Sequence, residues 1–258
     1  MEFGICSPVE GAEAVRAAGW DFIEESVQGL LQGTVPDAQW KGIERTKNAA
    51  LPIHSANMLV PGNLPITGPA VDLAKLREYI TRVLSRAHLL GLNVLVFGSA
   101  GARNVPDGFS RKSAERQIVE FASMLAPLAQ EHDVIVVAEA LHRPESNIIN
   151  TIPEAMQHVQ AVNHPNFQCL FDSYHFWMED EPLENLRAAV PWIKHVHLAD
   201  KSGRLAPGES RQADYRPVFK ILKEARYSGR MSVEAMNFDI PKAGPRVLKF
   251  LRNQWENC

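Results

Sequence analysis

Eight short apolar runs, rich in β-branched and aromatic residues, alternate with longer stretches of helical character along the chain. This alternation is typical of βα units, in which each strand of a parallel sheet is followed by a helix that covers it. The runs are FGIC from Phe3, DFIEE from Asp21, LPIHSA from Leu51, NVLVFG from Asn93, VIVVAEA from Val134, FQCLFD from Phe167, IKHVHLA from Ile193 and MSVEAM from Met231. Eight such units favour an α/β fold closed into a (β/α)8 barrel, although an open doubly wound sheet shares the alternation.

The length of the chain fits one barrel, because 258 residues match the about 250 that such a fold usually takes. No linker or low-complexity tract divides the sequence, so we expect a single domain over residues 1–258. One helix is predicted over Val71 to Leu90, where Leu, Ile and Val recur at intervals of three and four. Three helices are expected to end in a left-handed glycine before a strand, in AAGWDFIE, LLGLNVLVF and YSGRMSVE.

Charge and cysteine usage narrow the partners and the compartment. The formal net charge is −3, with 27 basic and 30 acidic residues and no basic run, so nucleic acid is not an expected partner. The start lacks a secretory pattern and no apolar run is long enough to span a membrane, so we expect a soluble cytoplasmic protein. Cys6, Cys169 and Cys258 are too few and too scattered for a disulfide framework. We expect Cys6 and Cys169 to be buried spectators, with an active-site contact as the alternative.

Four candidate ligands for a hard metal ion lie at or near the carboxyl ends of the last four predicted strands. They are Glu139 in VVAEA, Asp172 in CLFDSYH, His197 in KHVHLAD and Glu234 in SVEAM. A carboxylate that ends an apolar run must reach solvent, form a pair or bind a cation, because burying it alone is costly. Each residue taken singly is more often a helix cap or an ion-pair partner, but four in the same position predict one shared ion.

The spacing of these four residues supports convergence. They are 33, 25 and 37 residues apart, close to the roughly 30 residues of a βα unit, so each comes from a different strand. Neighbouring parallel strands lie about 4.8 Å apart, which lets inward side chains at one height reach the same ion. Three carboxylates and one imidazole suit Mn²⁺ first, then Mg²⁺ or Co²⁺, with Zn²⁺ left open.

Further polar residues surround this predicted metal site. Glu145, His175 and Arg204 follow the same strands and are candidate substrate-binding residues, although loop polar residues are also common at surfaces. His195 lies two residues before His197 on one strand, so both face the same way. We expect His195 to occupy a neighbouring layer of the barrel interior.

These segments make the chain resemble the sugar phosphate isomerase/epimerase superfamily of xylose isomerase-like TIM barrels, especially the ketose 3-epimerases and hydroxypyruvate isomerases. The resemblance spans essentially the whole chain and rests on EALHR at Glu139, FDSYH at Asp172, HVHLAD with GRLAPGE, and VEAM at Glu234. It implies metal ligands at Glu139, Asp172, His197 and Glu234, with both glutamates also serving as acid/base groups. It further implies substrate contacts for Glu145, His175 and Arg204.

The chain departs from that pattern at two places. His142 replaces the Asn that ketose epimerases usually carry in Glu-x-x-Asn-Arg, and the loop before Arg204 is about one residue longer, which bears on substrate identity. Three-zinc repair endonucleases share the barrel. They need extra ligands, whereas the fourth strand here ends in Phe97-Gly98-Ser99, so we do not expect a nuclease.

The predicted chemistry is proton transfer beside a carbonyl through a metal-stabilised enediolate, on a small ketose or keto acid. Return of the proton to the same carbon gives epimerisation, and return to the adjacent carbon gives aldose–ketose isomerisation. Two alternatives stay open, namely an inosose or keto-polyol dehydratase and a metal-containing sugar-binding barrel without catalysis. A homodimer or homotetramer is expected by resemblance to related barrels.

Overall fold

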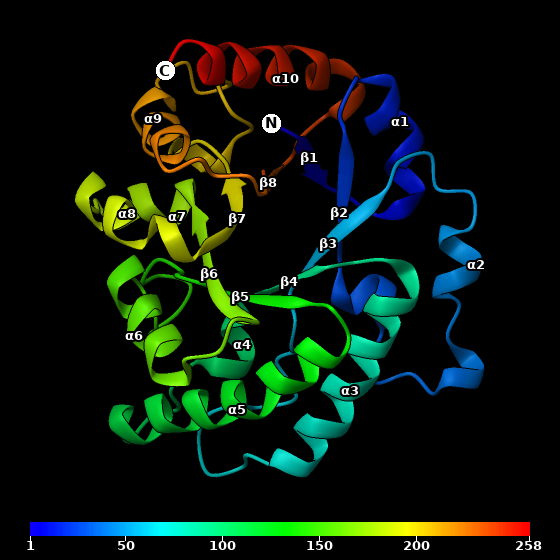
Figure 1. Cartoon of the computed structure of the whole chain (residues 1–258), viewed down its shortest axis with the longest axis vertical. Helices are drawn as coiled ribbons and strands as arrows, with labels where there is room; N and C mark the ends of the chain where they lie inside the picture. The colour runs from blue at the N-terminus through cyan, green and yellow to red at the C-terminus, as the bar shows by residue number, and fades with distance from the viewer.

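The computed structural model describes residues 1–258, and its eight parallel strands close into a barrel. Each strand pairs with the next in chain order, and β1 pairs with β8 to complete the ring (Figure 1). The strands are β1 Phe3–Cys6, β2 Phe22–Ser26, β3 Ile53–Asn57, β4 Val94–Phe97, β5 Ile135–Glu139, β6 Phe167–Asp172, β7 Ile193–Leu198 and β8 Arg230–Val233. The closed ring confirms the predicted (β/α)8 barrel and excludes an open doubly wound sheet.

Helices surround this ring of strands (Figure 1). The α-helices are α1 Ala12–Ala17, α2 Gly42–Thr46, α3 Leu73–Leu90, α4 Ala100–Arg103, α5 Arg111–Glu131, α6 Ile152–Val162, α7 Ser173–Met178, α8 Leu183–Ala189, α9 Arg216–Glu224 and α10 Ile240–Glu256. Short turns of other helix types are η1 Val9–Gly11, η2 Val27–Leu31, η3 Asp37–Gln39, η4 Val190–Trp192 and η5 Ser202–Arg204.

The helix predicted over Val71 to Leu90 is α3, and its start is set by a side-chain cap. The carboxylate of Asp72 accepts hydrogen bonds from the backbone N–H groups of Ala74 and Lys75, at 3.1 Å each. Such a cap satisfies N–H groups that have no partner within the helix, so the helix begins after Asp72.

The buried apolar residues form two separate clusters, one large and one small. A cluster of 63 buried apolar residues joins the outer face of the strands to the inner faces of the helices, which holds the two layers together by hydrophobic burial. Leu95 and Phe97 of β4 belong to this cluster, whereas Val94 and Val96 belong to a separate small one. Since strand side chains alternate, Val94 and Val96 face the barrel interior. The candidate site shares that interior.

The left-handed glycines before strands are confirmed at two of the three predicted positions. Gly19 and Gly91 have φ of +88° and +77°, and each follows the end of a helix. The prediction for YSGRMSVE is wrong, because Arg226 has the positive φ there, at +57°. Gly229 instead lies where a Cβ atom would overlap the ring of Tyr227, so close packing requires it.

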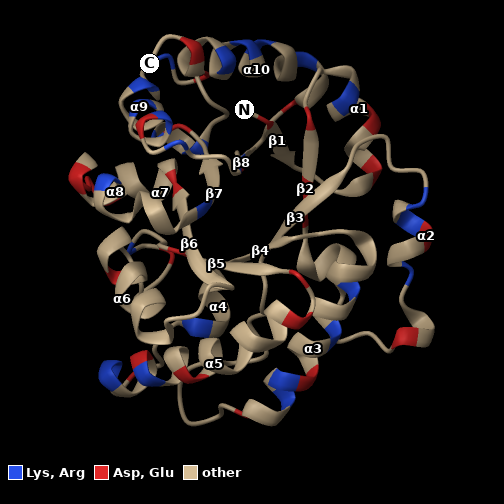
Figure 2. Cartoon of the chain, viewed as in Figure 1, with Lys and Arg blue, Asp and Glu red and all other residues tan.

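Charged residues of both signs are interspersed on the outer helices (Figure 2). This distribution agrees with the small net charge of −3. The face in view therefore carries no large positively charged patch that would attract a polyanion. None of the helices combines the length and the hydropathy that crossing a lipid bilayer would require.

Candidate active site

The four predicted ligands meet at the carboxyl end of the barrel. Glu139 and Asp172 are the last residues of β5 and β6, His197 is the penultimate residue of β7, and Glu234 follows β8 directly. One potential ligand atom from each residue lies within 4.8 Å of those of the other three. The predicted convergence of four chain-distant side chains is therefore present in the fold.

His197 stands at the centre of the cluster. Its Nδ1 atom lies 3.2 Å from Glu139 Oε1, 3.2 Å from Glu234 Oε2 and 3.9 Å from Asp172 Oδ2. The side chains of His197, Asp172 and Glu139 are at most 6% exposed, and that of Glu234 is 23% exposed. Glu234 is thus the member of the cluster most open to solvent.

Burial and the close approach of charged side chains shift the pKa values of the residues in this cluster. Burial raises the pKa of Asp172 to about 6, against the opposing charges of Arg204 and His197. Burial alone would lower the pKa of His197, but Glu24 and Glu234 hold it well above its usual range. Burial also raises the pKa of Glu139. A positive charge at the centre of the cluster is therefore favoured.

The residues fit a divalent cation. Asp172 Oδ2 is buried and has no hydrogen-bond partner, which is costly for a carboxylate oxygen unless another group reaches it. Three carboxylates and one imidazole nitrogen form a hard donor set that suits Mn²⁺, Mg²⁺ or Co²⁺. Gly98 also leaves room for the cluster, because a Cβ atom there would overlap Glu139 Oε2. The residue that follows β4 therefore has to be small, which agrees with the absence of a candidate ligand at this strand end.

A second polar group, Glu145, His175 and Arg204, borders the cluster. Glu145 Oε2 lies 3.8 Å from His175 Nε2 and 3.7 Å from Arg204 Nη1. Arg204 Nη2 donates to Glu234 Oε2 at 2.5 Å. His175 Nε2 and Arg204 Nε are buried without partners, so this side of the site offers unused donors to a ligand.

The orientation of His175 follows from its neighbour His142. The backbone N–H of His142 donates to His175 Nδ1 at 3.2 Å, and the two imidazole rings stack with centroids 5.0 Å apart. Because Nδ1 accepts, the neutral ring carries its proton on Nε2. Burial lowers the pKa of His175 to about 4, so the ring is neutral at neutral pH. Through its backbone N–H and its stacked ring, His142 therefore positions a candidate substrate-binding residue.

Sequence reasoning missed two residues that contact the cluster. Asn57, the last residue of β3, donates its side-chain amide to Glu234 Oε1 at 2.8 Å. Glu24 of β2 accepts a hydrogen bond from His197 Nε2 at 2.9 Å. Asn57 ends an apolar run, as the predicted ligands do, so the same signal was available there, whereas Glu24 lies within its strand beside a second glutamate, Glu25.

The expectation for Cys6 needs correction, whereas that for Cys169 holds. Cys169 is buried and unpaired, as predicted. Cys6 is partly exposed rather than buried, and its sulfur lies within 4.8 Å of ligand atoms of Glu24 and His197. The end of β1 meets the same polar interior as β2 and β7, which explains why an apolar run delivers a cysteine next to the site.

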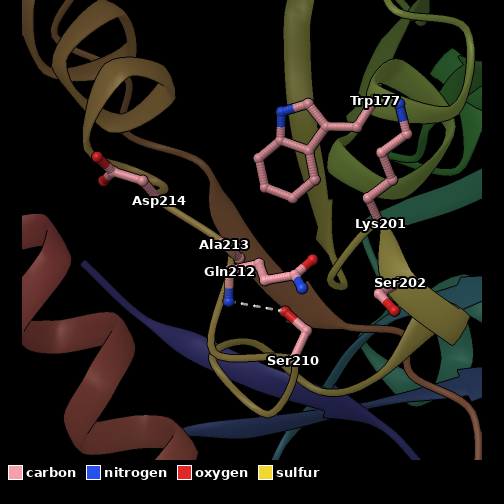
Figure 3. Close-up of a pocket in the computed structure, with 7 residues that line it drawn as sticks. All are labelled: Trp177, Lys201, Ser202, Ser210, Gln212, Ala213 and Asp214. Carbon is pink, nitrogen blue, oxygen red and sulfur yellow. Dashed lines mark hydrogen bonds between the residues drawn. The ribbon is translucent and has the colours of Figure 1, made fainter.

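A separate pocket of about 280 Å³ lies beside the loops that follow β6 and β7. Its lining residues, drawn in Figure 3, are Trp177, Lys201, Ser202, Ser210, Gln212, Ala213 and Asp214. The Trp177 ring also meets Tyr215 edge to face, with centroids 5.0 Å apart. None of the four candidate ligands lines this pocket, so it is distinct from the cluster.

A closed (β/α)8 barrel with a carboxylate–imidazole cluster at the carboxyl ends of its strands defines a barrel enzyme, since that end carries the active site in this fold. Residues 12–254 match the family model described as xylose isomerase-like TIM barrel. The chain belongs to this family.

Individual relatives agree with that assignment. The chain is 26% identical over 254 residues to L-ribulose 3-epimerase of Methylomonas sp. (strain DH-1), covering 95% of this chain and 84% of the relative. It is 25% identical over 163 residues to a putative hydroxypyruvate isomerase of Mus musculus, covering 60% and 58%. A solved D-psicose 3-epimerase, studied in the presence of D-fructose, shares the fold with a TM-score of 0.84 at 18% identity and 99% coverage of both chains. These relatives are isomerase-class enzymes, as was expected for this chain.

Proposed function

We propose that the protein is a divalent-metal-dependent sugar isomerase or epimerase that acts on a small ketose or keto acid. The observation that carries the proposal is the meeting of Glu139, Asp172, His197 and Glu234 within 4.8 Å at the carboxyl end of the barrel. Relatives named as ketose 3-epimerases and hydroxypyruvate isomerases support the same substrate class.

These four residues would hold one ion, with Mn²⁺ the first candidate and Mg²⁺, Co²⁺ or Zn²⁺ as alternatives. When bound, such an ion acts as a Lewis acid that stabilises negative charge developing on neighbouring substrate oxygens. The protein contributes a fixed and largely buried donor set, so little rearrangement is needed when a substrate arrives.

Glu139 and Glu234 are the proposed acid/base pair. One carboxylate removes the weakly acidic proton from the carbon beside the carbonyl, and the other delivers a proton to the resulting enediolate. Their surroundings differ, because Glu234 accepts hydrogen bonds from Arg204 and Asn57, whereas the carboxylate of Glu139 has a hydrogen bond with His197 alone. Delivery to the same carbon inverts it, and delivery to the neighbouring carbon interconverts ketose and aldose.

Glu145, His175 and Arg204 are the proposed substrate-binding residues. The Nε2–H group of His175 and the Nε–H group of Arg204 are buried donors without partners, and a sugar oxygen can accept from each. Glu145 lies between them as an acceptor for a hydroxyl group and is partly exposed. A polyhydroxylated ligand satisfies both kinds of group, which an apolar ligand does not.

The proposal is tested by measuring solvent deuterium incorporation into a panel of ketoses with Mn²⁺ present. Wild-type protein should exchange one carbon-bound proton of its substrate, and Glu139→Gln or Glu234→Gln should abolish the exchange. Glu25→Gln is the matched control, because Glu25 accepts from the backbone N–H of Val9 away from the cluster. Near-normal exchange in either active-site variant contradicts the mechanism. Loss of water from an inosose or keto-polyol would instead identify a dehydratase.

A further inference from the structure

Glu24 is a buried carboxylate that links four strands inside the barrel. It lies on β2, its side chain is fully buried, and it accepts hydrogen bonds from residues of β3, β7 and β8. The donors are Ser55 Oγ at 2.8 Å, His195 Nε2 at 2.6 Å, His197 Nε2 at 2.9 Å and Ser232 Oγ at 2.7 Å. A buried charge with this many donors is fully satisfied, so the fold tolerates it.

The two oxygens of Glu24 have different partners. Oε2 accepts from Ser55, Ser232 and His195, which belong to three different strands. Oε1 accepts from His197 alone. His195 and His197 are two residues apart on β7 and therefore face the same interior. One oxygen is thus held in place by the barrel while the other is presented to His197.

This arrangement decides which nitrogen of His197 is available to an ion. An ionised carboxylate only accepts hydrogen bonds, so Nε2 of His197 carries its proton and Nδ1 keeps its lone pair in the neutral ring. Nδ1 is the atom that lies 3.2 Å from both Glu139 Oε1 and Glu234 Oε2. Without an ion, Nδ1 is protonated and donates to Glu139, and an ion that displaces this proton would meet the Nδ1 lone pair inside the carboxylate cluster.

We propose that Glu24 is a positioning residue that fixes the tautomer and the ring orientation of His197 for metal binding through Nδ1. This inference rests on the metal site of the proposed function. Groups that orient a metal-bound histidine also raise its basicity, and their loss typically weakens metal binding about 10- to 100-fold.

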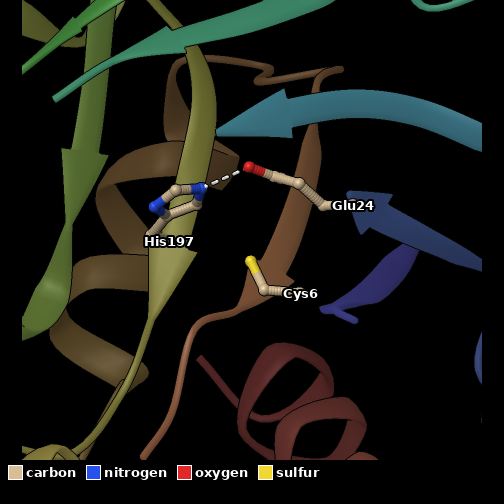
Figure 4. Close-up of side chains that lie close together, drawn as sticks. All are labelled: Cys6, Glu24 and His197. Atoms are coloured by element: carbon tan, nitrogen blue, oxygen red, sulfur yellow. Dashed lines mark hydrogen bonds and ion pairs between the residues drawn. The ribbon is translucent and has the colours of Figure 1, made fainter. Parts of the chain in front are cut away.

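A second metal site at Cys6, Glu24 and His197 is the competing explanation. Their potential ligand atoms lie within 4.8 Å of one another, and Figure 4 shows the Cys6 sulfur beside the bonded pair. Both oxygens of Glu24 already accept hydrogen bonds, however, and His197 Nε2 already donates one. An ion would have to displace these bonds, whereas the positioning role uses them as they stand.

The neighbouring residue Glu25 supplies a matched comparison. It is also buried on β2, but its carboxylate accepts from the backbone N–H groups of Val9 and Ser26 and touches none of the four candidate ligands. The same substitution at adjacent positions therefore separates an effect on His197 from a general effect of removing a buried carboxylate.

The experiment compares Mn²⁺ dissociation constants of wild-type, Glu24→Gln and Glu25→Gln proteins by chelator competition. A glutamine has one oxygen and one NH₂ group, so it cannot accept from both histidines, and it lacks the negative charge. We expect Glu24→Gln to bind Mn²⁺ about 10- to 100-fold more weakly and Glu25→Gln to bind like wild type. Equal affinity of all three proteins, or equal weakening in both variants, overturns the inference.

A measurement on wild-type protein keeps the test decisive if Glu24→Gln does not fold. In the Zn²⁺-loaded protein, nitrogen NMR of His197 should show a proton on Nε2 and the metal on Nδ1. A proton on Nδ1, or coordination through Nε2, overturns the role of Glu24 while leaving metal binding intact. Wild-type protein that binds neither Mn²⁺ nor Zn²⁺ overturns the metal site itself and, with it, this inference.

Discussion

Arg204 Nη2 lies 2.5 Å from Glu234 Oε2, so the loop after β7 holds the glutamate that follows β8. The same guanidinium lies 3.7 Å from Glu145 and 5.0 Å from the centre of the Tyr174 ring. Arg204 thus joins the proposed acid/base pair to the proposed substrate-binding residues, and a flat, charged fork suits this position better than an ammonium group does.

Arg204→Lys should therefore impair catalysis although it keeps the charge. Losing a charge-assisted hydrogen bond costs about 1.5–3 kcal/mol, so we expect kcat/KM for proton exchange to fall roughly 10- to 100-fold. Steady-state exchange kinetics with Mn²⁺ present measure this. Arg246→Lys is the control, since Arg246 pairs with Glu209 at the surface. Unchanged kcat/KM in Arg204→Lys would show that Arg204 is dispensable.

Gly98→Ala should reduce activity more than stability. The added Cβ overlaps Glu139 Oε2, which is the end of a flexible side chain and can move aside. Moving that carboxylate displaces a proposed ligand and base, and small displacements of reacting groups cost about a hundredfold in rate. Thermal unfolding and exchange rates measured on the same sample check both parts. A variant with full activity argues against the placement of Glu139.

Mn²⁺ should stabilise the folded protein. An ion present at 100 times its dissociation constant adds about 2.7 kcal/mol to the free energy of unfolding, which corresponds to a rise in Tm of roughly 5–10 °C for a chain of this size. Asp172→Asn should remove this rise because it neutralises a ligand, whereas Glu145→Gln should keep it. Thermal scans with Mn²⁺ and with a chelator make the comparison. An equal rise in Asp172→Asn would place the ion elsewhere.

Cys169 should resist alkylation in the folded protein even at alkaline pH. Burial raises the pKa of its thiol from 9.0 to about 12, so little of the reactive thiolate forms as pH rises to 9. Mass-spectrometric mapping after iodoacetamide treatment at pH 9 should find Cys258 modified and Cys169 intact until the chain is unfolded in guanidinium. Rapid modification of Cys169 in native protein would mean that β6 is not packed as described.

The fold was predictable because its signal is local and repeated. Each strand corresponds to an apolar run in the sequence, and the run FQCLFD matches β6 residue for residue. The recognition of the family and of the isomerase class is confirmed by the comparisons. The cap at YSGRMSVE was not predictable in this way, because the positive φ falls on Arg226, whereas Gly229 is required by close packing against Tyr227.

The site was predictable where a charged residue ends a strand and not where it lies within one. Glu139, Asp172 and Glu234 stand out against apolar neighbours at strand ends, whereas Glu24 lies beside Glu25 in the middle of β2. Which of the two faces the barrel interior depends on the pairing register of β2 with β3, and that register shifts between Ile23 and Glu24. The metal-ligating role of these residues, the substrate and the oligomeric state stay predictions.

Anomalous X-ray diffraction from Mn²⁺-soaked crystals tests the central claim most directly. The account predicts one strong manganese peak within bonding distance of Glu139, Asp172, His197 and Glu234, with His197 contributing Nδ1. No peak at this cluster, or a stronger peak at His142, Glu145 and His175, would contradict it.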